Sequence, residues 1–404
     1  MKIFLRAVSA VRATTPDGFA ALKVTALGNP RLLERVSNAI IALRDFYRDL
    51  GNGQGKLTRD GFISGWTAAF DVTEKEAAAQ FNRFDGNQDG LLDALEFTNS
   101  LPLEEVARLV LKCRRKGPLY ASVLSKAEFE AFANMSRRLD QIGEFAYKLV
   151  RGGCVVQHLP WSLITFFYQV NFLNRILSFI RKEVRLMVDA EHTYFQPCID
   201  HAVLQLQRKY NKDYPAIFGT YQAYLRDCNS RLQIDLERAR REGFHLGAKL
   251  VRGAYMSHER ERARARDYPD PIHPTVEQTH ASCAPLLSHR ASHRAEPRFS
   301  SADEQAVDAL MAGGERVSIV LATHNQRSIE RAVEQIIRSD SAVSPLHKQA
   351  RFIVLSRLIP FSAATGFKAY KYVPYGPENS DALSGASQQR TMMLRELRRR
   401  LIGF

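Results

Sequence analysis

Short apolar runs recur along the chain and alternate with stretches that have the periodicity of amphipathic helices. Most of these runs end in polar or charged residues. Buried runs that are separated by helical stretches are typical of strands in a parallel sheet, where a helix connects each strand to the next. We predict strands at residues 19–27, 184–191, 216–224, 247–253 and 317–325.

This alternation predicts an α/β fold, most simply a (β/α)8 TIM-type barrel. Asn29 and Pro30 form an N-cap and first-turn pair, which predicts an amphipathic helix that ends near residue 49. Ser125 and Glu128 have the spacing of a capping box and predict a long helix that ends near residue 149. After the predicted strand at 247–253, the helical stretch is almost entirely charged.

Changes in this pattern divide the chain into segments that we interpret as domains and insertions. They are the start of the barrel at 1–50, an insertion of short helices around glycine-rich loops at 51–102, a helical segment at 103–150, an atypical apolar insertion at 151–183, and the main barrel portion with a basic C-terminal helix at 184–404. Polar residues such as His158, Asn171 and Arg175 interrupt the apolar insertion, so we do not expect it to span a membrane.

The composition is that of a globular protein with an excess of positive charge. Hydrophobic residues make up 45% of the chain, and the formal net charge is +14. Basic runs at 238–241, 260–266 and 395–400 lack the interleaved aromatic side chains that a nucleic-acid surface needs. We interpret them as solvated helix faces, with attraction to an anionic membrane as the alternative, and expect no nucleic-acid partner.

The cysteines and the N-terminus indicate the cellular compartment. The five cysteines are odd in number and lack metal-ligand spacing, so we expect reduced thiols inside the cell. The first fifteen residues are basic and precede the first acidic residue, Asp17, as in a mitochondrial transit peptide. They also lead directly into the first predicted strand, which leaves little room for a removable leader.

Polar residues stand at the ends of the predicted strands. They are Lys23, Asp189, Glu191, Gln222, Lys249, Arg252, Thr323, His324 and Asn325. Burying a charge is costly unless it is paired, so any single one of them could be a structural ion pair. A barrel brings its strand ends together at the face where catalytic groups lie, so we expect one shared site. The chain lacks the glycine patterns of Rossmann and P-loop nucleotide sites.

A separate motif at residues 85–96 matches the pattern of a calcium-binding EF-hand loop throughout. Gly90 would make the turn of this loop. The predicted oxygen ligands are Asp85, Asn87, Asp89, the carbonyl group of Leu91, Asp93 and Glu96. The sequence does not decide whether such a calcium ion would be regulatory or structural.

Residues 50–61 resemble a sister loop, which would complete an α-helical EF-hand pair. Gly55 and Leu57 stand at matching positions. Leu50 and Gly61 stand where the first and last ligands should be, so we expect no metal in this loop.

Six blocks of the sequence resemble the motifs of the proline dehydrogenase family of FAD-dependent barrel enzymes, in the same order. They read LKVTALGNP, VRLMVDAEHTYFQP, TYQAYLRD, KLVRGAYM, THN and KYVPYGP. The second and fourth blocks are the most specific. The resemblance is to the mitochondrial type, and it implies a distorted (β/α)8 barrel with FAD bound non-covalently over the strand ends.

The resemblance also implies roles for single residues. The implied flavin contacts are Gln222, Lys249, Arg252, Gly253, Ala254, Thr323, His324, Asn325 and Glu378. Lys249 would stand near the reactive edge of the flavin, where it would stabilise developing negative charge. Lys23 and Asp189 would form a pair on the floor of the substrate site, and Tyr255 and Tyr372 would wall it. These last four are the candidate catalytic residues.

The implied reaction transfers a hydride from the ring carbon of L-proline to the flavin and gives 1-pyrroline-5-carboxylate, the first step of proline degradation to glutamate. Electrons would then pass to a membrane quinone. The implied location is the matrix side of the mitochondrial inner membrane, with peripheral membrane contact.

Three departures from the family pattern bear on this expectation. The chain begins after the family's first strand, so we expect an incomplete barrel. The segment before KYVPYGP is shorter than its counterpart, and Pro377 leads directly into Glu378, without the helix whose arginine pair would hold the substrate carboxylate. The alternatives are therefore a hydroxyproline dehydrogenase and a catalytically impaired calcium-binding isoform.

Overall fold

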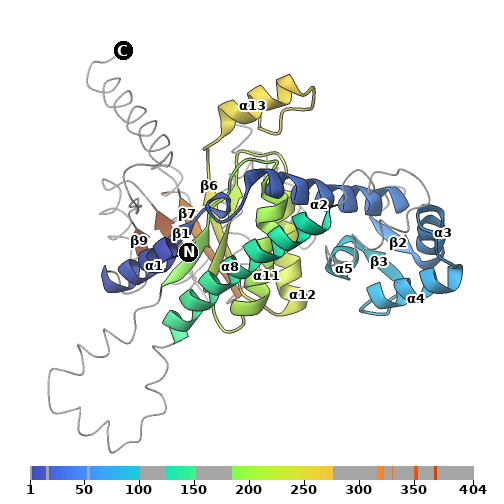
Figure 1. Cartoon of the computed structure of the whole chain (residues 1–404), viewed down its shortest axis with the longest axis horizontal. Coiled ribbons are helices and arrows are strands. Elements are labelled where there is room, and N and C mark those ends of the chain that lie inside the picture. Colours follow the sequence, from blue (N-terminus) through green and yellow to red (C-terminus); the bar gives the residue numbers. More distant parts are fainter. Residues whose placement is uncertain are drawn as a thin grey trace, which may run out of the picture.

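The centre of the molecule is a parallel sheet of seven strands (Figure 1). The computed structural model describes residues 2–14, 18–51, 55–100, 124–151, 184–275, 316–322, 330, 350–353 and 368–370. In spatial order the strands are β1 (Phe19–Leu22), β4 (Arg185–Val188), β5 (Ile217–Gln222), β6 (Leu246–Val251), β7 (Val317–Ala322), β8 (Ala350–Ile353) and β9 (Lys368–Tyr370). Every neighbouring pair is parallel, so the carboxyl ends of all seven strands lie at one face.

The sheet curls so that its two edge strands approach each other. Phe19 on β1 and Tyr370 on β9 meet edge to face, with their ring centroids 5.2 Å apart. Phe19 also packs against Phe218 of β5, at 5.3 Å. Within the described residues β1 and β9 form no ladder, so the α/β fold with a parallel sheet is confirmed, whereas a closed barrel stays a prediction.

Helices cover the outside of the sheet. They are α1 (Lys2–Thr14), α2 (Pro30–Leu50), α8 (Lys126–Arg151), α11 (Gln196–Tyr210) and α12 (Cys228–Glu242). A further helix, α13 (Met256–Ala265), follows β6. The main core lies where α2, α8 and α11 bury their apolar faces against β1, β4 and β5. In contrast, α13 projects beyond the carboxyl ends of the strands (Figure 1).

Two buried amide side chains at the end of α11 hold it to the sheet. The Nδ2 group of Asn211 donates to the carbonyl oxygens of Ile217 and His245, each at 2.8 Å. The Nε2 group of Gln207 donates to the carbonyl of Gly247 at 2.9 Å. Gly247 is required at this point because a Cβ atom there would lie 2.4 Å from the carbonyl oxygen of Ile217. These contacts fix where β5 and β6 lie relative to α11, and thereby where the side chains at their carboxyl ends lie.

A second, smaller core belongs to a pair of helix–loop–helix units beside the seven-stranded sheet. It contains β2 (Lys56–Thr58), α3 (Arg59–Ala69), α4 (Glu74–Phe84), β3 (Leu91–Asp93) and α5 (Ala94–Ser100). The two loops pair antiparallel through β2 and β3, with Leu57 opposite Leu92. Gly55 and Gly90 occupy equivalent places before these strands and share a φ of +77°, a left-handed conformation that favours glycine. Buried aromatic side chains fill the space between the helices.

The sequence predicts several of these elements well. Asn29 caps α2 by accepting a hydrogen bond from the amide of Arg31 at 3.0 Å, and α2 ends at Leu50, as expected. Glu128 accepts from the amide of Ser125 at 2.7 Å and its own amide donates to the Ser125 hydroxyl at 3.3 Å, which confirms the capping box of α8.

The prediction of the first strand was too long. β1 ends at Leu22, and a 3-10 helix (Val24–Ala26) follows Lys23, so Lys23 leaves the strand and is free to point across the strand ends. β8 and β9 were not predicted at all. Most of the apolar insertion at 151–183 lies outside the described residues, and none of the described helices is long and apolar enough to cross a membrane.

Candidate functional site

A partly buried ion pair links the carboxyl end of β4 to the middle of β6. The Nζ atom of Lys249 lies 2.8 Å from Oδ1 of Asp189, and the two side chains are 9% and 15% exposed. Lys249 points inward from β6, two strands away from Asp189. Each charge offsets part of the desolvation cost of the other, so the loss of either partner would leave an uncompensated charge in the site. This pair brings side chains of two strands that are not neighbours in the sheet together at one place.

Lys23 contributes a second cation to the same site. We predicted that it would pair with Asp189, and this is a correction, because the ion pair of Asp189 is with Lys249. Lys23 instead donates to the hydroxyl of Tyr255 over 3.4 Å. Burial alone would lower the pKa of Lys23, but Tyr255, Glu191 and Asp189 raise it above its ordinary value. Lys23 is therefore a protonated cation at neutral pH.

Two buried residues beside these cations form a polar wall. The carboxylate of Glu191 accepts hydrogen bonds from the amide of Thr25 at 3.1 Å and from its hydroxyl at 2.7 Å. Gln222 donates through Nε2 to the Glu191 carbonyl and to the hydroxyl of Tyr224, each at 2.8 Å. The side-chain oxygen of Gln222 is buried without a hydrogen-bond partner. Since an orphaned buried acceptor is costly, it fits a bound group with an N–H donor.

The segment after β6 leaves room above the strand ends. Arg252 is half-buried, and Gly253 and Ala254 are exposed. A Cβ atom added to Gly253 would meet nothing nearer than the sulfur of Met256, at 3.5 Å. Packing therefore does not demand glycine at this position. A flat cofactor that approaches the backbone would demand it.

The remaining candidate site residues lie outside the described residues. They are Thr323, His324 and Asn325, which follow β7, and Tyr372 and Glu378, which follow β9. Their predicted roles stay predictions.

Sequence reasoning missed a cluster that holds α13 over the site. Glu259 is 1% exposed and accepts hydrogen bonds from the amide of Thr193 at 2.7 Å and from its hydroxyl at 2.6 Å. Nδ1 of His192 lies 3.3 Å from the same carboxylate. The ring of His192 lies 4.3 Å from that of Tyr255. A buried glutamate inside a charged helix gives no sequence signal that separates it from its solvated neighbours.

Glu259 should make the free energy of unfolding depend on pH in the acidic range. Burial would raise its pKa, but the hydrogen bonds from His192 and Thr193 lower it below the ordinary value. Because the folded-state pKa is depressed, the stabilisation is present above the ordinary pKa near 4.5 and is lost as pH falls through the folded value. We expect Glu259→Gln to be about 1–3 kcal/mol less stable at pH 7, and its stability to fall less steeply below pH 4.5. Urea unfolding from pH 7 to pH 3 measures this, and parallel curves would contradict it.

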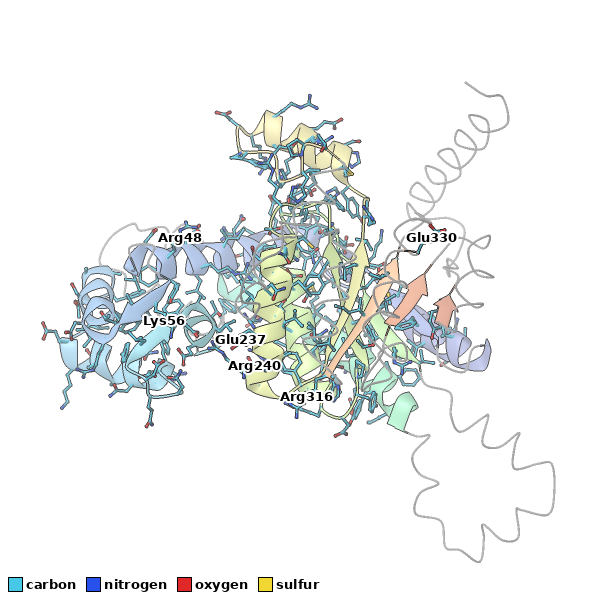
Figure 2. All side chains as sticks on the ribbon, turned by 180° about the vertical axis from the view of Figure 1, so that it is seen from behind. Arg48, Lys56, Glu237, Arg240, Arg316 and Glu330 are labelled. Atoms are coloured by element: carbon cyan, nitrogen blue, oxygen red, sulfur yellow. The ribbon has the colours of Figure 1, made fainter. Side chains whose placement is uncertain are left out.

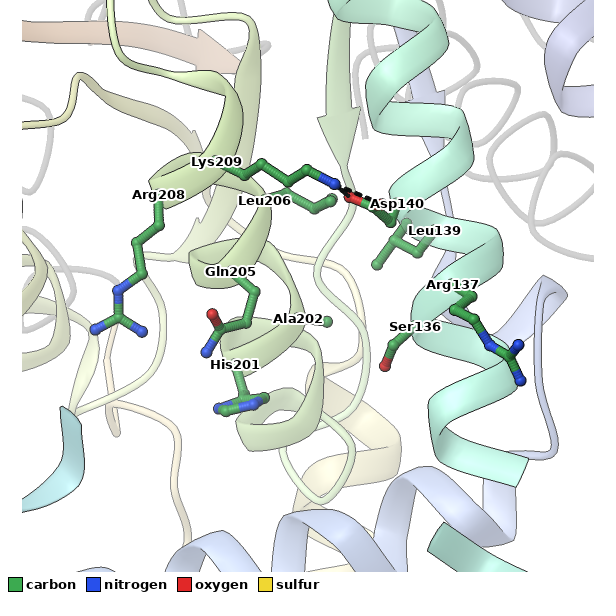
Figure 3. A pocket seen from close by; sticks show the side chains of 10 residues that line it. All are labelled: Ser136, Arg137, Leu139, Asp140, His201, Ala202, Gln205, Leu206, Arg208 and Lys209. Carbon is green, nitrogen blue, oxygen red and sulfur yellow. Dashed lines mark hydrogen bonds and ion pairs between the residues drawn. The ribbon is translucent and has the colours of Figure 1, made fainter. Parts of the chain in front are cut away.

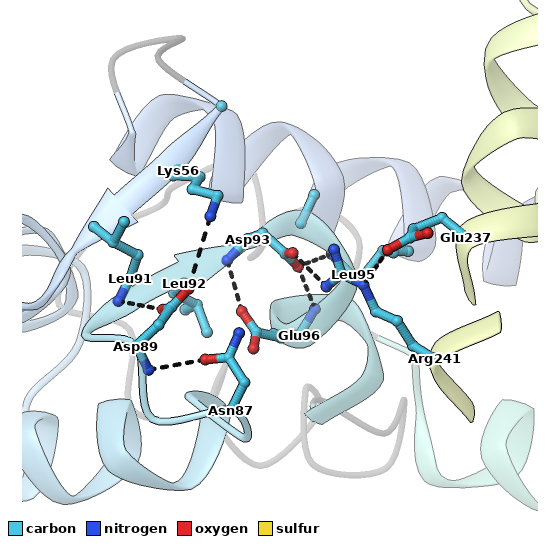
Figure 4. Close-up of polar contacts among 12 residues, drawn as sticks. Lys56, Asn87, Asp89, Leu91, Leu92, Asp93, Leu95, Glu96, Glu237 and Arg241 are labelled. Carbon is cyan, nitrogen blue, oxygen red and sulfur yellow. Dashed lines mark hydrogen bonds and ion pairs between the residues drawn. The ribbon is translucent and has the colours of Figure 1, made fainter. Parts of the chain in front are cut away.

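The acidic loop between α4 and β3 is the second candidate site. Its carboxylates accept hydrogen bonds from loop amides. Asp85 accepts from the amide of Gly90 at 3.0 Å. Asp89 accepts from the amide of Leu91 at 2.8 Å (Figure 4). Glu96 accepts from the amide of Asp93 at 3.0 Å. Burial, followed by the negative charges of the neighbouring aspartates, raises the pKa of Glu96. The loop therefore concentrates negative charge that a cation would relieve.

Two cations from other segments already contact this loop. Nζ of Lys56 lies 3.7 Å from Oδ2 of Asp89, and Arg241 of α12 forms an ion pair with Asp93 (Figure 4). Among the described residues, no three His, Cys, Asp or Glu side chains stand together in a way that could hold a metal ion. In this conformation the carboxylates of the loop accept hydrogen bonds from backbone amides or form ion pairs with Lys56 and Arg241.

A groove between α8 and α11 lies away from both sites. It has a volume of about 490 Å³ and is lined by residues such as Ser136, His201 and Gln205 (Figure 3). Two of its cations form ion pairs, Lys209 with Asp140 at 2.7 Å and Arg208 with Glu242, and Arg137 donates a hydrogen bond to Asn134. None of its lining residues stands at a strand end, so it is not the predicted cofactor site.

Comparison with known proteins gives consistent matches. A family model described as proline dehydrogenase matches residues 119–381. The chain is 32% identical over 430 residues to "Proline dehydrogenase 1, mitochondrial" of Caenorhabditis elegans, covering 99% of this chain and 61% of that protein. It is 30% identical over 436 residues to the human protein of the same name, covering 99% and 63%. The chain thus spans about three-fifths of the length of these relatives.

Two further matches are more distant or shorter. The chain is 31% identical over 235 residues to hydroxyproline dehydrogenase of Xenopus laevis, covering 54% of this chain and 47% of that protein. Among solved structures, proline utilization A from Bdellovibrio bacteriovorus matches with a TM-score of 0.44 and 16% identity, covering 62% of this chain and 21% of that one.

Proposed function

The chain belongs to the proline dehydrogenase family, and from that premise we propose that it oxidises L-proline to 1-pyrroline-5-carboxylate with FAD as its cofactor. The observation that carries the proposal is the buried Lys249–Asp189 pair beside Lys23 and Gln222 at the carboxyl face of the parallel sheet. The relatives that match almost the whole chain are named mitochondrial, so we propose a mitochondrial location, peripheral to the inner membrane on its matrix side, with quinone as the electron acceptor.

Each half of the site has a proposed task. The bound flavin would accept a hydride from the ring carbon of proline. Gln222 and the Arg252–Ala254 segment would hold the cofactor, and Lys249 would stabilise negative charge near it. Lys23 and Tyr255 would form the substrate side, together with Asp189. Because Lys23 is charged at neutral pH, it offers attraction to the carboxylate of an amino acid.

The purified chain tests this function directly. We expect a yellow protein with flavin in near-stoichiometric amount, whose visible absorbance is bleached by L-proline under anaerobic conditions. A colourless protein that flavin does not restore would contradict the proposal and favour the impaired isoform. Faster bleaching by trans-4-hydroxy-L-proline than by proline would favour the hydroxyproline alternative, for which the shorter match to a hydroxyproline dehydrogenase is the supporting observation.

We also propose that the loop at 85–96 binds Ca²⁺, as one member of an EF-hand pair whose sister loop is silent. The support is the backbone: two loops of matching glycine conformation are joined by a short antiparallel ladder between Leu57 and Leu92. The ligands would be Asp85, Asn87, Asp89, the carbonyl of Leu91, Asp93 and Glu96, which are the oxygen donors that Ca²⁺ prefers. Glu96 would have to leave the amide of Asp93 to join them. Calorimetric titration with Ca²⁺, against Glu96→Gln, tests this proposal, and heat that is identical for both proteins would contradict it.

Arg241 should weaken this calcium site. It forms an ion pair with Asp93, and Glu237 of the same helix holds its guanidinium at 2.7 Å. A calcium ion must compete with that cation for Asp93, so we expect Arg241→Gln to bind Ca²⁺ roughly two- to fivefold more tightly, the effect of a partly exposed ion pair. Arg240→Gln is the matched control, because it removes another arginine that pairs with Glu237. Arg240 and Glu237 are both labelled in Figure 2. Equal affinities of the two variants would contradict the competition.

A further inference from the structure

A stack of four side chains connects α13 to the turn after β4 and ends at the candidate substrate site. The guanidinium of Arg262 lies 3.7 Å above the ring of Tyr194. Tyr194 and His192 are stacked, with centroids 5.0 Å apart and planes at 12°. His192 in turn contacts the ring of Tyr255 at 4.3 Å, and the hydroxyl of Tyr255 accepts from Lys23. Tyr255 is therefore the half-buried end of this stack, on the side of the candidate substrate site.

His192 is held both by ring contacts within this stack and by a contact of its ring nitrogen with a buried carboxylate. Its ring is held between Tyr194 and Tyr255, and its Nδ1 atom lies 3.3 Å from the buried carboxylate of Glu259. That carboxylate is itself fixed by two hydrogen bonds from Thr193. Through its contacts with His192 and Thr193, Glu259 thus anchors α13 to the turn that carries His192.

Tyr255 has few other restraints. Its amide lies 3.5 Å from the hydroxyl of Tyr224, at the limit of a hydrogen bond, and its own hydroxyl contacts Lys23 over 3.4 Å. Neither contact fixes the tilt of the ring. The ring of His192, whose centroid lies 4.3 Å from that of Tyr255 at an interplanar angle of 50°, occupies the space beside Tyr255 and so restricts the tilt of its ring.

We propose that His192 is a positioning residue for substrate: it sets the orientation of Tyr255 over Lys23 and so determines how tightly a cyclic amino acid is held. This inference rests on the proposed function. His192 contacts neither Lys23 nor the Lys249–Asp189 pair among the contacts described, so it acts through Tyr255. Its loss therefore affects substrate binding more than flavin binding or the hydride-transfer step.

The test compares three variants of the full chain by anaerobic and steady-state kinetics with L-proline. We expect His192→Ala to raise KM roughly ten- to thirtyfold, with kcat and flavin content changed by less than about threefold. His192→Phe keeps an aromatic face and is expected to restore KM to within about threefold of wild type. The matched control is His258→Ala, because His258 lies 5.9 Å from the His192 ring but is exposed on α13.

Several outcomes would overturn the proposal. An unchanged KM in His192→Ala would do so, as would a His192→Phe variant that behaves like His192→Ala, because the ring face would then not be what matters. A wild-type chain that proline does not reduce contradicts the proposed function separately. In that case nitration of Tyr255 by tetranitromethane, followed by peptide mass spectrometry, still tests the positioning. We expect faster nitration in His192→Ala than in wild type or His258→Ala, and equal rates would refute the role of His192.

Discussion

Replacing Lys249 by methionine is expected to lower the rate at which L-proline bleaches the flavin by about 10²–10³-fold. The change keeps a similar apolar stem but removes the ammonium group that lies 2.8 Å from Asp189. Two effects act together. A cation near the reacting centre is lost, and the carboxylate of Asp189, only 15% exposed, is left without its ion-pair partner. Stopped-flow absorbance under anaerobic conditions measures the rate.

The matched control for this prediction is Lys209→Met. Lys209 also pairs with an aspartate, Asp140, at 2.7 Å, but it is 56% exposed and lies on the outer helix α11. We expect its loss to leave flavin reduction unchanged. Flavin content must be measured first, because a colourless Lys249→Met protein would mean that Lys249 is needed to hold the cofactor. If the variant is fully loaded and is reduced at the wild-type rate, Lys249 has no role in the reaction.

The elements that the sequence predicts well are those with local causes. Asn29 next to Pro30 and the Ser125–Glu128 pair each satisfy free amides of a helix start with side chains a few residues away, so their meaning is readable from spacing alone. β5 and β6 are likewise readable because they are long and buried on both faces. In contrast, β8 and β9 contain only four and three residues, too few to establish a period.

Which charged side chains pair within the site depends on contacts between residues far apart in the sequence. This is why the prediction of the partner of Asp189 was wrong. In the structure Lys249 pairs with Asp189, and Lys23 lies near enough to Asp189 for its charge to raise the pKa of Lys23. Which lysine reaches Asp189 depends on strand length and register. β1 stops at Leu22, which sends Lys23 toward Tyr255, whereas Lys249 reaches inward from the middle of β6. Strand length and register depend in turn on how α11 packs against the strands through Asn211 and Gln207. No local sequence pattern reveals this packing.

Helix α2 joins the two cores and explains why the loop pair is part of this fold rather than a loose appendage. Its first half buries Leu33, Val36 and Ile40 in the main core beside the parallel sheet. Its second half buries Leu43 and Phe46 in the aromatic core of the loop pair. One helix of 21 residues therefore serves both units, and the ion pair between Arg241 and Asp93 adds a second link. The two cores share helix α2 but contain different side chains, so a substitution in one core can be tested for its effect on the other.

Trp66→Ala is expected to destabilise the loop pair by about 3–5 kcal/mol. Trp66 is 1% exposed, and its ring contacts Phe62 at 4.8 Å and Phe70 at 4.6 Å, with Phe84 at 5.9 Å. Removing it opens a cavity that the surrounding rings cannot fill, because they are held by one another. A unit with so small a core has little stability in reserve. We therefore expect α3, α4 and α5 to unfold locally.

Hydrogen–deuterium exchange with peptide resolution separates this local effect from a global one. Peptides from α3 and α4 should lose protection in Trp66→Ala, while peptides from β5 and β6 should keep theirs, since their core contains none of the same side chains. Ser64→Ala, an exposed change in the same helix, should alter stability by less than about 0.5 kcal/mol. Equal loss of protection in β5 and β6 would show that α2 transmits the damage and that the two cores fold as one unit. Retained protection in α3 would show instead that the aromatic cluster is not what holds the loop pair together.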